Sequence, residues 1–94
     1  MVTVNKDGGD SGISLVEFEK EFYVADVVEG PFYGTSIDKG DKILSINGKK
    51  SKDISSLAYA EELLEFKEKI TLFVMRPDLK DRGYNWVIRN TWAR

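Results

Sequence analysis

The 94-residue chain contains no cysteine and no histidine. Without cysteine, a disulfide framework, a thiolate zinc site and a cysteine nucleophile are all excluded, and a reducing compartment is permitted. Without histidine, the commonest general base and the commonest metal ligand are missing, so catalysis would have to depend on carboxylate, Lys, Tyr or Ser chemistry. We therefore expect no enzyme activity, no metal site and no cofactor.

The chain also has no excess of positive charge and no long apolar run. The 14 Lys and Arg residues face 16 Asp and Glu residues, which gives a net charge of -2. This balance lacks the positive field that nucleic-acid binding usually needs, so we expect no nucleic-acid partner. The apolar runs are far shorter than the ~20 residues that span a bilayer, and no apolar signal core begins the chain. We expect a soluble protein with one core.

Short alternating or apolar runs between turn residues predict a β-rich domain. The connection Glu19-Lys20-Glu21 joins two such runs and predicts an antiparallel hairpin, and Asn47-Gly48 predicts a second tight turn. Residues 32–36 are expected to form a short turn or helix. The expected strands are residues 1–5, 13–18, 22–28, 42–46 and 70–75.

One segment, residues 57–67, has the pattern of an amphipathic helix. Its apolar residues at 57, 60, 63 and 64 form one stripe, and Ser55 or Ser56 can cap its free N–H groups. By pattern alone, the chain is a small, mainly β domain with a helix packed on it.

Four blocks of sequence, taken in order, resemble the PDZ domain family. They are SGISL at 11–15, KGDKILSING at 39–48, AEELL at 60–64 and ITLFV at 70–74, and the second block is the most specific. The resemblance implies a partly open β-sandwich or barrel of five to six strands with one long and one short helix, in the strand order of animal PDZ domains. It assigns residues 1–76 to the domain and leaves residues 77–94 as an extension that packs on the domain or on a partner.

The resemblance also implies a peptide-binding groove between the strand at 13–18 and the helix. An edge strand can pair with an extended peptide, and amides near Gly12 can converge on a terminal carboxylate. Ile13, Leu15 and Leu64 are expected to form the pocket for the last side chain. The full set of expected peptide-binding residues is Ser11, Gly12, Ile13, Ser14, Leu15, Val16, Leu57, Glu61 and Leu64.

Two positions depart from the family pattern. Ser11 stands where a large apolar residue is usual, which removes one wall of the pocket, and no histidine begins the helix. Two alignments of the helix remain open, one with Leu57 first and Glu61 fifth, the other with Ser56 first and Ala60 fifth. We favour the first because it turns the leucines inward. Leu57 then predicts an apolar third-last ligand residue, whereas the charge of Glu61 favours a basic or hydroxyl side chain.

The remaining segments are less distinctive. Lys49, Lys50 and Lys52 form a basic cluster that is interpreted as a solvated loop rather than a lipid site. The alternation of Tyr84, Trp86 and Ile88 is that of a half-buried strand, and we expect an extra strand or turn that packs its aromatic side chains on the domain. Two alternatives remain for this tail: it forms a homodimer or docks a neighbouring domain through residues 84–92, or it lies over the groove.

We expect a non-enzymatic module that captures protein C-termini by β-strand addition, as part of a scaffold or adaptor protein in signalling. The resemblance implies partners such as membrane receptors or channels, and a cytoplasmic location at the membrane-associated cortex when such partners are bound. The alternatives are a degenerate PDZ domain that oligomerises or docks through its tail, and a protease accessory domain, which the strand order disfavours.

Overall fold

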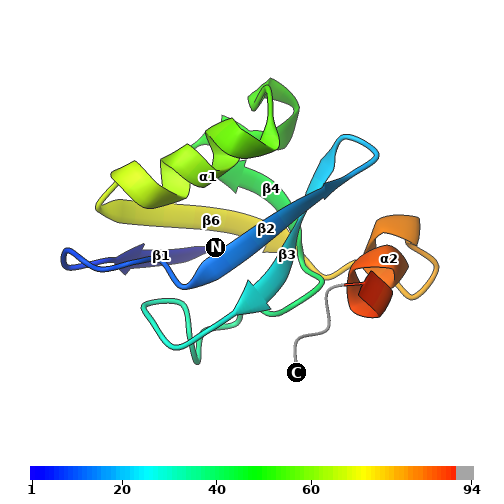
Figure 1. Cartoon of the computed structure of the whole chain (residues 1–94), viewed down its shortest axis with the longest axis horizontal. Helices are drawn as coiled ribbons and strands as arrows, with labels where there is room; N and C mark the ends of the chain where they lie inside the picture. The colour runs from blue at the N-terminus through cyan, green and yellow to red at the C-terminus, as the bar shows by residue number, and fades with distance from the viewer. Residues whose placement is uncertain (91–94) are drawn as a thin grey trace.

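A computed structural model describes residues 1–90 and consists of an antiparallel sheet with two α-helices (Figure 1). Mainly β structure is thus confirmed. The strands are β1 (Val2–Asn5), β2 (Ile13–Phe18), β3 (Glu21–Val27), β4 (Lys42–Ile46), β5 (Lys49–Lys50) and β6 (Lys69–Met75); the helices are α1 (Leu57–Phe66), α2 (Arg82–Asn90) and the short 3₁₀ turn η1 (Ser51–Asp53).

The sheet order is β1-β6-β4-β3-β2, with β5 paired to β4. Every pairing is antiparallel. Within residues 1–90, β2 pairs with β3 alone and is therefore an edge strand. The topology thus leaves one long side of β2 without a partner strand.

Two tight turns set the register of the hairpins as the sequence predicts. Glu19 and Lys20 have φ angles of 50° and 69°, and Asn47 and Gly48 have 51° and 83°. Two consecutive residues with positive φ are typical of the type I′ turn, whose twist matches that of paired strands. The β2–β3 hairpin and the β4–β5 turn follow from these local conformations.

The core lies between the sheet and α1. Its side chains come from every long strand and from one face of the helix, and they are buried because alternate strand positions and the i, i+4 positions of α1 point inward. Ser56 caps α1 by accepting a hydrogen bond from the Tyr59 N–H at 3.1 Å. Ala60 and Leu64 are the buried residues of α1, and the largest wholly buried side chains elsewhere include Phe22, Phe32, Ile43, Ile46, Ile70 and Leu72.

The prediction of a strand in the tail is wrong, because residues 82–90 form the helix α2. The carboxylate of Asp81 accepts a hydrogen bond from the Tyr84 N–H at 2.9 Å, which satisfies a free donor of the first turn. The buried residues Gly83 and Val87 lie four apart on one helical face. The alternation at 84, 86 and 88 misled the prediction because the buried face of α2 is formed by Gly83 and Val87, whereas Trp86 and Ile88 are exposed.

Helix α2 packs against β3 and β2 through close side-chain contacts and a charged hydrogen-bond network. Gly83 sits so close to Tyr23 that an added Cβ would lie 2.1 Å from the phenol ring carbon Cζ. The Tyr23 hydroxyl donates to Asp81 at 2.8 Å, and the Lys42 ammonium lies 3.2 Å from the same carboxylate. The ring of Phe18 contacts that of Trp86 at a centroid distance of 5.5 Å. The extension is therefore joined to the domain by close packing and a charged network.

The network shifts the ionisation of both its acidic members. Burial, followed by the hydrogen bond to Asp81, raises the pKa of Tyr23. For Asp81, partial burial opposes ionisation, but the bonds from Tyr84, Tyr23 and Lys42 outweigh it and lower the pKa of this carboxyl. Asp81 is thus held as a carboxylate at neutral pH.

Across residues 1–90, neither helix has the length and apolar character needed to cross a bilayer.

Candidate functional site

The candidate site is the groove between β2 and α1. The start of β2 lies beside the end of α1, because Ile13 and Leu64 line the same pocket. The two elements run in opposite directions (Figure 1). The unpaired edge of β2 faces the groove, so its outward N–H and C=O groups are available to an additional strand.

A loop with a positive-φ glycine begins the groove. Gly12 has φ +78°, and a Cβ at this residue would lie 3.0 Å from the carbonyl oxygen of Val28. Its own carbonyl accepts a hydrogen bond from the Val28 N–H at 2.8 Å, which ties the loop to the end of β3. Both the left-handed conformation and the close approach require glycine here.

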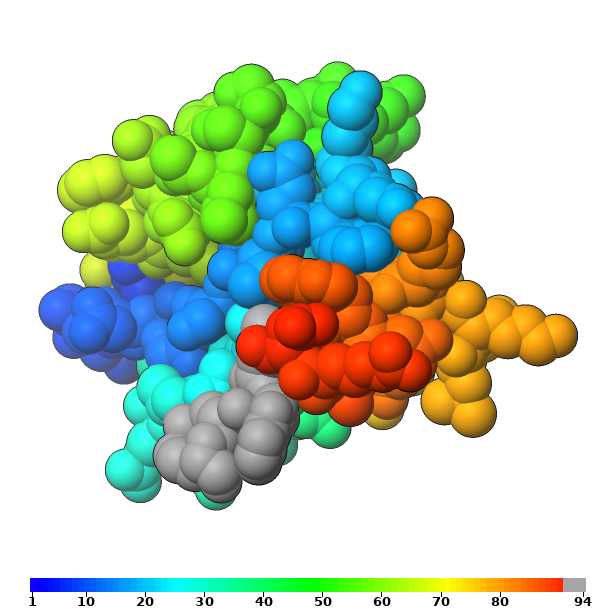
Figure 2. Space-filling view, turned by 45° about the vertical axis from the view of Figure 1, so that its right-hand side comes forward, coloured from blue at the N-terminus to red at the C-terminus, as the bar shows by residue number. Residues whose placement is uncertain are grey.

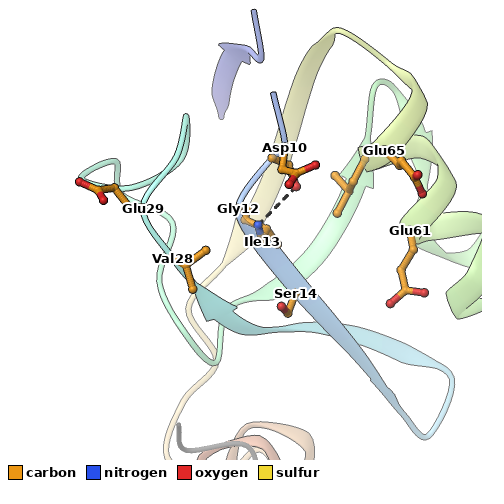
Figure 3. A pocket seen from close by; sticks show the side chains of 10 residues that line it. Asp10, Gly12, Ile13, Ser14, Val28, Glu29, Glu61 and Glu65 are labelled. Carbon is orange, nitrogen blue, oxygen red and sulfur yellow. Dashed lines mark hydrogen bonds between the residues drawn. The ribbon is translucent and has the colours of Figure 1, made fainter. Parts of the chain in front are cut away.

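The loop presents three N–H groups near one another. Within the described residues, the Ser11 and Gly12 N–H groups donate no hydrogen bond. The Ile13 N–H donates to the Ser11 hydroxyl at 3.3 Å, a longer distance than the usual 2.9–3.0 Å (Figure 3). Two free donors and one weakly bonded donor can therefore receive an anionic oxygen.

These residues line a pocket of about 490 Å³. The structure brings together six of the expected binding residues, namely Ser11, Gly12, Ile13, Ser14, Glu61 and Leu64. Three others lie outside its lining: Leu15 is buried in the core, Leu57 packs against the core, and Val16 is half-buried on β2. The part of all nine residues in ligand binding stays a prediction.

Sequence reasoning missed several lining residues, and most of them are acidic. Asp10, Glu29 and Glu65 join Glu61, and Val28 completes the lining, which contains no basic side chain. Asp10 and Glu65 could have been found because each adjoins an expected site residue in the chain. Glu29 could not, because only the pairing of Val28 with Gly12 brings it to the pocket.

One buried cation lies next to this acidic pocket. The Lys6 ammonium donates to the carbonyl oxygen of Leu64 at 2.7 Å and also to that of Glu65. Lys6 therefore satisfies the free carbonyls at the C-terminal end of α1, where a positive charge is favourable. Among residues 1–90, Lys6 forms no ion pair with the lining carboxylates.

The start of α1 agrees with the favoured alignment of the helix. Leu57 is its first residue, Ser56 is its cap, and Glu61 one turn later reaches the pocket. In Figure 3, Glu61 and Glu65 extend from α1, Asp10 lies beside Gly12 and Ile13, and Glu29 points away from them.

Helix α2 lies away from the groove. In Figures 1 and 2, β2 runs between α1 and α2, and α2 packs on β3 and β2. Residues 82–90 thus do not cover the groove, and Trp92 lies outside the described residues. Trp86 and Ile88 keep 36% and 39% of their surface exposed, and the homodimer expected through residues 84–92 stays a prediction.

The site thus consists of an edge strand beside a helix, with a loop of free amides where the strand begins, an arrangement that can accept an extended peptide. The PDZ domain family model matches residues 1–75, and the chain belongs to this family. Among solved structures, the third PDZ domain of human Dlg5 is similar, with 25% identity and a TM-score of 0.72 over 86% of this chain and 71% of that one.

The fourth PDZ domain of MUPP1 has the same fold, with 23% identity and a TM-score of 0.63 over 81% of this chain and 74% of that one. The search of curated proteins finds no match. The family and these structures establish a PDZ domain, and hence a protein interaction module.

Proposed function

We propose that the domain captures the C-termini of other proteins by adding an extended peptide to the edge of β2. The observation that carries this proposal is the unpaired β2 edge, which begins directly after the free N–H groups of Ser11 and Gly12. Main-chain hydrogen bonds along β2 give the affinity, and the carboxylate fixes the end of the ligand. Bonds from backbone amides to a carboxylate are charge-assisted and hence stronger than neutral ones.

The pocket then selects the last side chain of the ligand. Ile13 and Leu64 supply its apolar wall, so an apolar last residue is expected. Ser11 is too small to provide a further wall, and its hydroxyl already accepts from the Ile13 N–H. The carboxylate must displace this hydroxyl to use all three donors, which keeps the affinity modest, around micromolar or about −8 kcal/mol.

The third-last side chain points toward α1, because alternate residues of a strand share a face. Leu57 begins the helix and offers an aliphatic surface there, which supports the expected contact with an aliphatic side chain or an aliphatic stem at this position. In a larger protein, such a module serves as part of a scaffold or adaptor. A cytoplasmic site of action, at the cortex when receptors or channels are bound, fits a binding domain of this kind.

Amide-resolved NMR tests where the peptide binds. The probe is the tightest binder selected from a random library of octapeptides with free carboxylates, titrated into the ¹⁵N-labelled domain. We expect the largest shifts at residues 11–16 and along α1, with new protection of the outward β2 amides. Shifts centred on residues 84–90 would instead identify the tail as the docking surface and overturn the proposal.

A further inference from the structure

We infer that the groove selects ligands with a lysine or arginine at the third-last position, and that Glu61 is the residue that selects them. This inference rests on the proposed capture of C-termini at β2. At this position of the ligand, the sequence supports two contacts: an apolar one with Leu57, and one between a basic ligand side chain and Glu61. The inference adds that the positive charge is what the groove selects.

The direction of the ligand fixes which part of α1 each side chain meets. A peptide that ends at the loop runs antiparallel to β2, because β2 begins there. Its last side chain meets Leu64, and its third-last residue lies two positions farther along, about 6.8 Å at 3.4 Å per residue.

The rise of the helix places Glu61 beside that position. Measured from Leu64, Glu61 lies about 4.5 Å back along the helix axis and Leu57 about 10.5 Å, at 1.5 Å per residue. The third-last side chain therefore lies between Glu61 and Leu57. An aliphatic stem that ends in a positive charge fits both, since its methylene groups pack on Leu57 and its head group reaches the Glu61 carboxylate.

The surroundings leave the charge of Glu61 available. Within the described residues, Glu61 has no hydrogen bond or ion pair, and the other charged lining residues, Asp10, Glu29 and Glu65, are also acidic. The nearby Lys6 is bound to helix carbonyls. A cation on the ligand thus meets an unpaired carboxylate in a pocket whose charged lining side chains are all acidic, whereas an anion at the same position meets repulsion from Glu61.

A matched peptide series tests the inference. The selected octapeptide is resynthesised with lysine, norleucine or glutamate at the third-last position; norleucine keeps the stem and lacks the charge. At low ionic strength we expect lysine to bind about twofold to fivefold tighter than norleucine, and glutamate to bind weakest, with differences that shrink in 0.5 M salt.

Two variants assign the effect to one side chain. Glu61→Gln should abolish the advantage of lysine over norleucine, while Glu62→Gln, an exposed neighbour outside the pocket lining, should retain it. Equal affinities for lysine and norleucine in the unchanged domain would overturn the inference, as would a lysine preference that survives in Glu61→Gln.

The same peptide series distinguishes a failure of this inference from a failure of the proposed function. If the free-acid peptides bind at β2 with no charge preference, the inference alone fails. If no free-acid peptide shifts the β2 amides, the proposed function fails as well.

Discussion

At the scale of single residues, Ser11 has two opposed effects on the candidate site. Its small side chain adds no apolar wall to the pocket, yet its hydroxyl accepts the hydrogen bond of the Ile13 N–H at 3.3 Å. The loop is thus partly satisfied before a ligand arrives. A ligand carboxylate gains less at this donor than at the free N–H groups, because an existing bond must first be broken.

Replacing Ser11 by alanine should therefore strengthen binding. Ser11→Ala frees the Ile13 N–H without adding bulk, and we expect a twofold to fivefold tighter affinity for the selected free-acid peptide, measured by calorimetry. The affinity for the C-terminally amidated peptide should change less. A weaker free-acid complex in Ser11→Ala would show that the hydroxyl itself helps to hold the ligand.

Single residues also show how much of the site the sequence could predict. Gly12 and Ile13 stand out because a turn glycine precedes an alternating run, and Leu64 because it lies on the apolar stripe of a helix. Glu29 and Lys6 carry no such signal, since their positions depend on which strand ends and helix ends meet. Local pattern therefore predicted the elements of the groove, but not the charges that surround it.

At the scale of secondary structure elements, α2 is the element that the sequence misplaced. An apolar residue at every second position predicted a strand at 84–88, but the Asp81 cap and the close approach of Gly83 to Tyr23 favour a helix. The predicted strands and α1 are confirmed to within one or two residues because their turns and cap carry clear local signals.

Gly83→Ala tests the packing of α2 on β3. On an exposed helix, this change would stabilise by up to about 1 kcal/mol. Here the new Cβ would collide with the Tyr23 ring, so we expect the free energy of unfolding to fall by about 1–3 kcal/mol.

Urea denaturation followed by circular dichroism measures the change. Arg89→Ala, an exposed position on the same helix, is the matched control and should remain within about 0.5 kcal/mol of the unchanged chain. A gain in stability for Gly83→Ala would show that α2 does not rest on Tyr23.

At the scale of the whole molecule, charge is separated rather than spread evenly. The net charge of -2 conceals an acidic pocket at the loop end of the groove and a second hollow lined by Lys49, Lys50, Lys52 and Lys67 beside the β4–β5 turn. The expectation of no nucleic-acid partner, drawn from overall composition, stays a prediction, and composition could not reveal this separation of charge. The charge relevant to the proposed ligand is that of the groove.

The arrangement of the whole molecule explains why helix α2 does not obstruct the proposed binding groove. Helix α2 packs on β3 and the far side of β2, so the domain keeps its free edge toward α1 while the extension covers another surface (Figure 2). The groove and the tail can therefore be tested separately.

The most direct test of carboxylate capture is a calorimetric comparison of one selected octapeptide with a free carboxylate and with a C-terminal amide. The two differ only in the group that the Ser11, Gly12 and Ile13 N–H groups are proposed to hold. We expect the free acid to bind in the micromolar range and the amide at least about tenfold more weakly. Equal affinities for the two peptides would contradict capture of the C-terminus.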